Sequence, residues 1–170
     1  ALAGSPAFDP NNFNNEKNFS VFLNNTVESM YELGSVVKPL TMAAGVEDGV
    51  VSPDSTYEDT GEVKIGGYTI KNFDNLAHGI QTMAQVLEKS LNTGVMYVAR
   101  LLGRDRHLDY LERFGLGKKT KVDLPGEAAG DISNLESGRE IDYLTASFGQ
   151  GIAVTPLQLA YAIGAIANHG

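Results

Sequence analysis

The chain has 170 residues, of which 42% are hydrophobic and 20% charged, and its formal net charge is −8 at pH 7. This length suits one domain with a sizeable core, and the negative charge excludes nucleic acid and an anionic membrane surface as favoured partners. The sequence contains no cysteine, which excludes disulfides, thiolate metal sites and cysteine nucleophiles, and it has no apolar run as long as a membrane span.

The first thirty residues contain few signals for regular structure. Residues 1–7 begin with an apolar piece, which we interpret as the end of a strand. Residues 8–26 are rich in asparagine, a residue that tolerates turn conformations, and predict a loop. The spacing of Val27, Met30 and Tyr31 then predicts a short helical turn.

A helix is predicted to follow a tight turn at Gly34 and Ser35 and to run from Ser35 to about Glu47. Gly49 lies just past its end, where glycine is favoured. Ser35 and Lys38 are three residues apart, so this helix places their side chains on one face.

This pair has the chemistry of a nucleophile and its base. A serine hydroxyl becomes a useful nucleophile near neutral pH only beside a group that takes its proton. Lys38 could do so if Val36, Val37 and Leu40 desolvate its ammonium, and the N–H groups at the helix start would face an oxyanion forming at Ser35. The Ser-x-x-Lys spacing is also common by chance, so on its own it leaves a non-catalytic role open.

Residues 47–62 contain six acidic side chains and no basic one. The ligand order of a calcium loop is absent, so we interpret the stretch as a solvated acidic face. Residues 62–65 and 68–71 alternate polar and apolar side chains around Gly66 and Gly67, which predicts a β-hairpin.

Three helices are predicted next, over residues 76–89, 92–102 and 104–114. The first has one apolar stripe, made of Ile80, Met83, Ala84 and Leu87. The second also has one apolar stripe, made of Val95, Val98, Ala99 and Leu102. Both stripes indicate faces that pack into a core.

The C-terminal third is rich in turns. Residues 115–138 predict a long loop with at most short elements, and residues 143–151 predict a turn-rich connector. Thr155 as N-cap and Pro156 at the first helical position predict a final helix to about Asn168. Its apolar positions are Leu157, Ala160, Tyr161 and Gly164.

The three histidines, His78, His107 and His169, are far apart in the chain, and none has a second histidine at ligand spacing. We therefore expect structural or exposed roles for them and no metal site.

Ser90 and Asn92 lie at the junction between two predicted helices, 55 residues after Ser35. A hydroxyl and an amide on a short loop opposite a nucleophile can relay a proton to a leaving group and hydrogen-bond a peptide-like substrate. Alternatively, Ser90 ends one helix and Asn92 caps the next, and the two interpretations are compatible.

Taken in order, these motifs and the pieces beside them resemble the transpeptidase domain of class B penicillin-binding proteins, in the serine acyl-transferase group that includes the serine β-lactamases. The resemblance spans nearly all 170 residues. It rests on Ser-Pro-Ala-Phe-Asp-Pro-Asn, Tyr-Glu-Leu-Gly-Ser-Val-Val-Lys-Pro-Leu-Thr, Glu-Lys-Ser-Leu-Asn-Thr-Gly, Val-Asp-Leu-Pro-Gly-Glu, and Ser-Phe-Gly-Gln-Gly through Thr-Pro-Leu-Gln-Leu-Ala.

The resemblance implies an α+β fold of the β-lactamase/transpeptidase type, represented here mainly by its helical part, a small β-hairpin and an incomplete central sheet. Residues 1–170 would be a partial transpeptidase domain, an interior segment that lacks N-terminal strands and the C-terminal strands with the family's Lys-Thr-Gly motif. Lys119 and Thr120 are followed by Lys121 and do not supply that motif. Leu33 stands where the family often has proline, which we expect to alter loop stiffness more than chemistry.

The resemblance also implies roles for four residues: Ser35 as the acylated nucleophile, Lys38 as its general base, Ser90 as a proton relay and Asn92 as a substrate-orienting amide. The family attacks a D-alanyl-D-alanine bond of a peptidoglycan stem peptide, releases D-alanine and passes the acyl group to an amine of a neighbouring peptide. β-Lactams acylate the same serine. No cofactor or metal is implied.

In its biological setting, the resemblance implies a bacterial enzyme of cell-wall synthesis, active in cell division or cell shape. It would carry a membrane anchor, act on the extracytoplasmic face of the cell membrane and work with a glycosyltransferase partner. The alternatives are a D,D-carboxypeptidase or β-lactamase-type hydrolase, and a non-catalytic penicillin-recognising sensor or inactive segment. The isolated segment is expected to be inactive, because the missing strands would complete the site.

Overall fold

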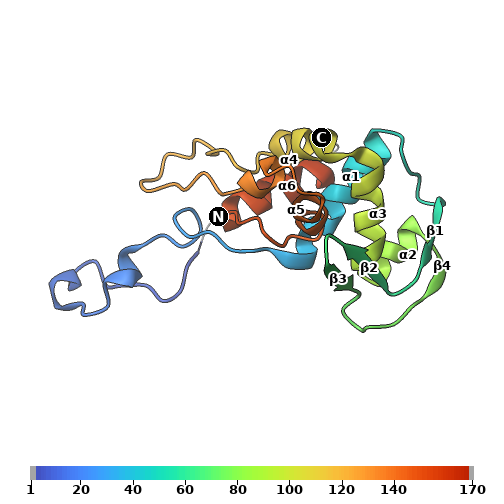
Figure 1. Cartoon of the computed structure of the whole chain (residues 1–170). Helices are drawn as coiled ribbons and strands as arrows, with labels where there is room; N and C mark the ends of the chain where they lie inside the picture. The colour runs from blue at the N-terminus through green and yellow to red at the C-terminus, as the bar shows by residue number, and fades with distance from the viewer. Residues whose placement is uncertain (1–2, 169–170) are drawn as a thin grey trace.

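The computed structural model describes residues 3–168, which form an α+β fold (Figure 1). The helices gather in the middle of the molecule, the strands lie at one end, and the N-terminal stretch extends from the other. The α-helices are α1 (Lys38–Glu47), α2 (Met83–Glu88), α3 (Asn92–Leu102), α4 (Arg104–Arg113), α5 (Glu140–Ala146) and α6 (Pro156–Ala167). The strands are β1 (Thr56–Asp59), β2 (Glu62–Ile65), β3 (Tyr68–Lys71) and β4 (Gly79–Thr82).

Helix α1 is the element that both parts of the core share. Its Met42 and Ala44 belong to a buried cluster with α3, and its Leu40 belongs to a second buried cluster with Leu111 of α4. Helices α1 and α3 also approach closely at Gly45, where a Cβ atom would lie 2.4 Å from a methyl of Val98. The α1 backbone is therefore fixed from two sides.

The predicted start of this helix is confirmed. Residues Gly34–Val37 form a 3₁₀ turn, η3, that leads directly into α1, so Ser35 stands one turn before the α-helix proper. Pro39 lies in the first turn of α1, where its missing N–H costs little. Gly49 has a φ of +73° just past the end of the helix, as expected of a C-terminal glycine.

The predicted hairpin is confirmed as well. Strands β2 and β3 pair antiparallel, with Glu62 opposite Lys71 and Ile65 opposite Tyr68. The two glycines between them, Gly66 and Gly67, have φ values of +54° and +87°, and positive φ at both central residues is what a tight hairpin turn requires.

The single helix predicted over residues 76–89 is wrong in its first half. Residues Gly79–Thr82 form β4, which pairs with β1, and only Met83–Glu88 is helical. Thr82 and Gln85 form a reciprocal capping box, which places the helix start at Met83. Of the predicted stripe, Met83 is buried, but Ile80 is 66% exposed because it lies on a strand.

One other expectation is wrong in part, and another holds with one exception. Residues Glu140–Ala146 form α5, so the connector predicted over residues 143–151 begins as a helix. Acidic side chains at its start, Glu140 and Asp142, favour a helix N-terminus, and Arg139 bonds Asp142. The acidic stretch of residues 47–62 is largely accessible to solvent, as expected, since Glu47, Asp54 and Glu58 are exposed. The exception is Asp59 of β1, which is buried.

The strand expected over residues 1–7 is absent from residues 3–7, and Ala1 and Leu2 lie outside the described residues. The loop that follows has two short 3₁₀ turns, η1 (Phe13–Asn15) and η2 (Phe19–Phe22). The turn predicted at residues 27–31 occurs slightly earlier, where the Asn24 carbonyl accepts bonds from the N–H groups of Val27 and Glu28 at 3.0 and 2.9 Å.

The C-terminal part largely follows the prediction. The 115–138 loop contains one described short element, the 3₁₀ turn η4 (Ser133–Glu136). Helix α6 starts at a capping box between Thr155 and Gln158. Its buried residues are Leu157, Gln158 and Ala162, whereas the predicted apolar positions Ala160, Tyr161 and Gly164 are exposed.

Among the described histidines, His107 is fully buried in α4 and His78 lies 2.8 Å from an Asp74 carboxylate oxygen, while His169 lies outside the described residues. Within residues 3–168, no helix has the length and apolar character needed to cross a membrane.

Candidate active site

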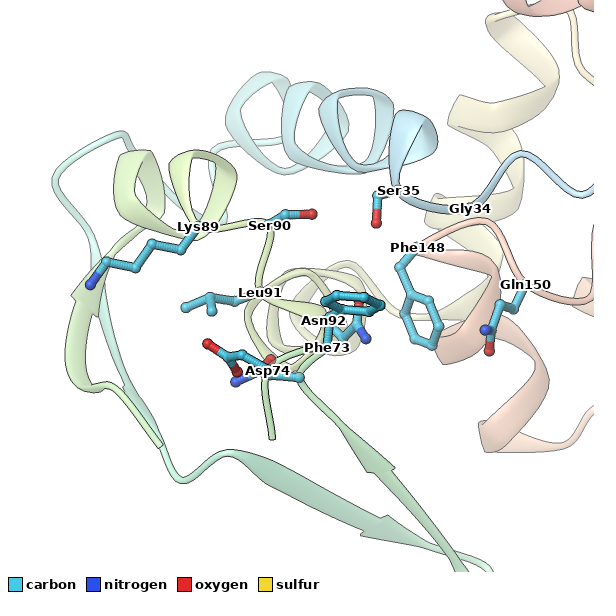
Figure 2. Close-up of a pocket in the computed structure, with 11 residues that line it drawn as sticks. Gly34, Ser35, Phe73, Asp74, Lys89, Ser90, Leu91, Asn92, Phe148 and Gln150 are labelled. Carbon is cyan, nitrogen blue, oxygen red and sulfur yellow. The ribbon is translucent and has the colours of Figure 1, made fainter. Parts of the chain in front are cut away.

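A pocket opens where η3, the α2–α3 junction and the segment after α5 meet (Figure 2). Ser35 is exposed on one side of it, and Ser90 stands opposite on the short link between α2 and α3. Figure 2 shows the two hydroxyls pointing into the same space. The lining residues are Gly34, Ser35, Asn72, Phe73, Asp74, Lys89, Ser90, Leu91, Asn92, Phe148 and Gln150.

Lys38 is buried at the base of α1, with 2% of its surface exposed. Its Nζ donates to the Ser90 hydroxyl at 2.9 Å and to the Ser90 carbonyl oxygen at 2.5 Å. Burial desolvates the ammonium and lowers the pKa of Lys38 from 10.5 to about 8. A substantial neutral fraction is therefore present near neutral pH, as a general base needs.

The apolar surroundings of Lys38 only partly match the expectation. Val37 and Leu40 are fully buried in one cluster, but Val36 is 48% exposed and turned to the surface. The desolvation of Lys38 therefore comes from the buried interior and not from the whole Val36–Val37–Leu40 set.

Ser90 has an unusual backbone conformation, with a φ of +55°. A non-glycine residue in this left-handed region is strained and persists only where its surroundings hold it. Here its N–H donates to the Leu87 carbonyl at 3.1 Å and its oxygens accept from Lys38. The conformation turns the Ser90 side chain towards the pocket (Figure 2).

Asn92 is the first residue of α3 and lines the same pocket. Its Nδ2 donates to the Lys71 carbonyl at the end of β3, at 2.8 Å. This bond fixes which way the amide faces. The alternative interpretation of the Ser90–Asn92 segment is half right. Ser90 does end α2, because it follows the C-cap residue Lys89 with a positive φ and the N–H groups of Ser90 and Leu91 donate back to the Leu87 and Val86 carbonyls. Asn92 does not cap α3, because the N-cap position is Leu91, which provides no side-chain cap.

The backbone before Ser35 rests against the Phe148–Gln150 segment. The Gly34 N–H donates to the Gly149 carbonyl at 3.2 Å, and a Cβ atom on Gly149 would lie 2.2 Å from the Gly34 oxygen. Gly149 also has a φ of +82°. Only glycine fits this contact, which sets the position of the turn that carries Ser35.

The structure thus brings the four residues named from the sequence together: Ser35, Ser90 and Asn92 on one pocket and Lys38 bonded to Ser90. Sequence patterns did not predict the other residues that line this pocket. Asn72 and Phe73 come from the loop after β3, and Phe148 and Gln150 come from the segment after α5. No local period marks these positions, although the glycines around Gln150 signalled a turn.

Comparison with known proteins gives one family. The family model of the penicillin binding protein transpeptidase domain matches residues 1–170. The chain is 33% identical over 170 residues to stage V sporulation protein D of Bacillus subtilis, covering 99% of this chain and 26% of that protein. It is 36% identical over 170 residues to the peptidoglycan D,D-transpeptidase FtsI of Escherichia coli K12, covering 100% of this chain and 28% of that protein. The chain therefore spans about a quarter of the length of these relatives.

Solved structures agree with this assignment. The transpeptidase domain of Burkholderia pseudomallei penicillin-binding protein 3 matches with a TM-score of 0.81 at 31% identity, over 86% of this chain and 44% of that one. Penicillin-binding protein 3 of Mycobacterium tuberculosis, solved in complex with ampicillin, matches with a TM-score of 0.80 at 36% identity, over 86% of this chain and 32% of that one. The chain belongs to the penicillin-binding protein transpeptidase domain family.

Proposed function

We propose that this chain carries the nucleophile half of a peptidoglycan D,D-transpeptidase site, with Ser35 as the residue that is acylated. The observation that supports this most strongly is the contact of a buried lysine of lowered pKa, Lys38, with Ser90, on the pocket where the exposed Ser35 hydroxyl also lies. Membership of the transpeptidase domain family gives the reaction type.

These positions support the following reaction. Neutral Lys38 takes the proton of the Ser35 hydroxyl as Ser35 Oγ attacks the carbonyl carbon between the two D-alanines of a stem peptide. The C–N bond then breaks, and Ser90 passes a proton from Lys38 to the departing D-alanine nitrogen, because its hydroxyl lies 2.9 Å from Lys38 Nζ. In the second half-reaction an amine of a neighbouring peptide attacks the ester carbonyl and gives a proton to neutral Lys38. The C–O bond to Ser35 then breaks, and the proton returns from Lys38 to Ser35 Oγ, which regenerates the serine.

Asn92 is assigned to substrate orientation. An amide has both donor and acceptor groups, and a peptide-like substrate presents both in return. Because the bond to the Lys71 carbonyl uses an Nδ2 proton, the amide orientation is set before substrate arrives, and pre-set polar groups lose less free energy on binding.

β-Lactams would acylate the same serine. The Mycobacterium tuberculosis relative has been solved with ampicillin and with aztreonam, which supports a covalent adduct here. The β-lactam carbonyl would take the place of the D-alanyl carbonyl, and opening of its ring would leave the acyl group on Ser35.

Residues 1–170 are proposed to be part of a larger transpeptidase domain, completed by strands that carry the Lys-Thr-Gly motif. The chain covers only 44% of a solved chain that is itself described as a transpeptidase domain, which supports this. A membrane anchor and a glycosyltransferase partner are proposed with it. A protein described as a peptidoglycan glycosyltransferase from Burkholderia ambifaria is similar to this chain, with a TM-score of 0.83 at 31% identity. Because peptidoglycan is the substrate proposed for this chain, the site would lie on the extracytoplasmic face of the membrane.

The test supplies the full-length protein with a peptide ending in D-Ala-D-Ala and an amine acceptor. Transfer predicts that free D-alanine and the amine-linked product form together, and that both are lost in Ser35→Ala. Release of D-alanine with water as the main acceptor would instead indicate a D,D-carboxypeptidase. No release of D-alanine from the wild type, together with stable penicillin binding, would indicate a sensor.

A further inference from the structure

A buried polar cluster lies next to the segment that carries Ser90 and Asn92. It consists of Asp59, Asn72 and Thr93, which are 1%, 2% and 4% exposed. Each member bonds the other two. The Thr93 hydroxyl lies 2.8 Å from Asp59 Oδ1, Asn72 Nδ2 donates to both Asp59 oxygens at 3.0 and 2.9 Å, and the Thr93 N–H donates to Asn72 Oδ1 at 3.2 Å.

The direction of these bonds follows from the donors present. The Thr93 hydroxyl has one proton and two candidate acceptors, Asp59 Oδ1 at 2.8 Å and Asn72 Oδ1 at 3.1 Å. The carboxylate is the closer and stronger acceptor, so Thr93 donates to Asp59. Tyr57 lies 3.2 Å from the same hydroxyl and can donate to it in turn.

Asp59 is held entirely by neutral donors. Besides Asn72 and Thr93, the backbone N–H groups of Gly61 and His78 donate to it at 2.9 and 3.1 Å. A buried carboxylate satisfied in this way is expensive to leave with an unmade bond. Removing any one of the three side chains should therefore be costly. The cluster rigidly joins the three segments that supply Asp59, Asn72 and Thr93.

Those segments meet at the start of α3. Asp59 ends β1, Asn72 directly follows β3, and Thr93 lies in the first turn of α3. The first N–H groups of a helix lack partners within the helix, and Leu91 provides no side-chain cap. Asn72 supplies the missing acceptor from another part of the chain, so the end of β3 holds both Asn92, through the Lys71 carbonyl, and Thr93.

Ser90 is therefore anchored from both directions. On its N-terminal side, the Leu91 N–H donates to the Val86 carbonyl of α2 at 2.9 Å. On its C-terminal side, the cluster fixes Thr93. Between these anchors Ser90 keeps its strained φ of +55° and its contact with Lys38. Without the second anchor, the strain would relax and move the hydroxyl.

We infer that Asp59, Asn72 and Thr93 are positioning residues for acyl transfer, which hold the Ser90–Asn92 segment against Lys38 and the substrate. This inference rests on the function proposed above. It extends the site to Asp59 and Thr93, which do not line the pocket, and gives Asn72, which does line it, a role in holding the start of α3.

The test compares Thr93→Val, which keeps the shape but removes the hydroxyl, with Thr93→Ser, which restores it. The acylation rate of the full-length protein is measured over a range of penicillin concentrations. This separates the apparent dissociation constant for penicillin from the acylation rate constant at saturation. We expect Thr93→Val to lower the saturated rate constant by about ten- to a hundredfold, as small misplacements do. We expect Thr93→Ser to recover most of the wild-type value.

Tyr57→Phe is the matched control, because it removes a donor to the same hydroxyl while leaving the Asp59–Asn72–Thr93 bonds in place. It should acylate at close to the wild-type rate. If Thr93→Val does not fold, Asn72→Ala serves in its place, since Asp59 keeps three of its four donor groups in that variant. It should show the same drop in rate constant.

A wild-type rate constant in folded Thr93→Val or Asn72→Ala would overturn the inference. An equal loss in Thr93→Val and Thr93→Ser would also overturn it, because packing and not the hydrogen bond would then be responsible. Failure of the proposed function looks different, since the wild-type protein itself would then form no adduct at Ser35.

Discussion

Lys38 is the residue whose environment most directly sets the chemistry. A surface lysine would be almost fully protonated at neutral pH and could not accept the serine proton. Burial lowers the pKa of Lys38 to about 8, and the bonds to Ser90 hold the Nζ in place. The proposed role of Lys38 as a base therefore depends on the fold removing it from water.

The acylation rate of the full-length protein should therefore rise with pH and level off above about pH 8. With a pKa of about 8, roughly a tenth of Lys38 is neutral at pH 7 and roughly nine tenths at pH 9, so this rise in pH should increase the rate about tenfold. Stopped-flow penicillin acylation across pH 6–10, a window chosen around that pKa, measures this.

Lys38→Arg is the companion variant, because a guanidinium stays protonated and cannot act as a base. We expect it to be nearly as inactive as Lys38→Ala. Near wild-type acylation by the arginine variant would mean that Lys38 serves only as a positive charge.

His107 links the site helix to acid stability. It is fully buried, its Nε2 lies 3.2 Å from the Thr41 hydroxyl of α1, and burial lowers the pKa of His107 to about 4 from 6.5. Between these values the unfolded chain binds more protons than the folded one. Stability from this residue is present above pH 6.5 and is lost as the pH falls towards 4.

The loss should be on the order of 3 kcal/mol across that window. Denaturant unfolding of wild type and His107→Gln at several pH values isolates it, because the carboxylates titrate alike in both proteins. The difference in free energy of unfolding between wild type and His107→Gln should shrink as the pH falls. A difference that does not change with pH would show that His107 is protonated without cost.

The site residues that could be predicted from the sequence are those marked by a local pattern. Ser35 and Lys38 are one helical turn apart, and Ser90 and Asn92 lie at a recognisable junction between helices. Asp59 and Asn72 could not be found in this way. Their contacts join residues 13 to 34 positions apart, and such distant pairing leaves no period in the sequence.

At the scale of elements, the contact between η3 and the segment after α5 controls where Ser35 stands. Gly149→Ala should displace Gly34, since the new Cβ would meet the Gly34 oxygen at 2.2 Å. We expect a loss of stability and at least a tenfold drop in acylation rate, on the order seen for small misplacements. Thermal melts and penicillin acylation measure the two effects.

Gly66→Ala is the matched control, because Gly66 also has a positive φ but has no heavy atom within 4 Å of the new Cβ. It should cost only the backbone strain, about 1–2 kcal/mol, and leave the acylation rate unchanged. If Gly149→Ala and Gly66→Ala changed the acylation rate equally, the contact between η3 and Gly149 would not be what positions Ser35.

Strong local signals predicted some elements and misled on others. Helix α3 and the β2–β3 hairpin follow directly from a buried apolar stripe and from the Gly66-Gly67 turn. The apolar spacing around Ile80 suggested a helix, but pairing with β1 made it a strand. That pairing joins residues 20 to 26 positions apart, so only the Thr82–Gln85 capping pattern could have marked the true helix start.

At the scale of the whole molecule, α6 carries large apolar side chains that the described residues leave exposed. Tyr161, Ile163 and Ile166 are 58%, 37% and 41% exposed. Large exposed apolar groups on one helix are unusual for a finished surface. This supports the proposal that further strands of the same domain pack here.

The isolated Ala1–Gly170 chain should therefore acylate slowly or not at all and should self-associate. Without the Lys-Thr-Gly strand it would also lack a donor for the oxyanion, a loss worth about a hundred- to a thousandfold in rate. Size-exclusion chromatography and penicillin labelling check both points. Efficient stoichiometric acylation of a purified monomer would contradict the proposed domain boundaries.

The central claim is that Ser35 is the acylated residue, and peptide mapping after penicillin treatment of the full-length protein tests it most directly. Trypsin should release residues 18–64 as one peptide, because Lys38 is followed by proline. We predict one added penicillin mass on this peptide, with fragment ions that place it on Ser35. The adduct should be lost in Ser35→Ala. It should be retained in Ser52→Ala, because Ser52 is an exposed serine of the same peptide that has no proposed role. An adduct that persists undiminished in Ser35→Ala, or that maps to another serine, would contradict the account.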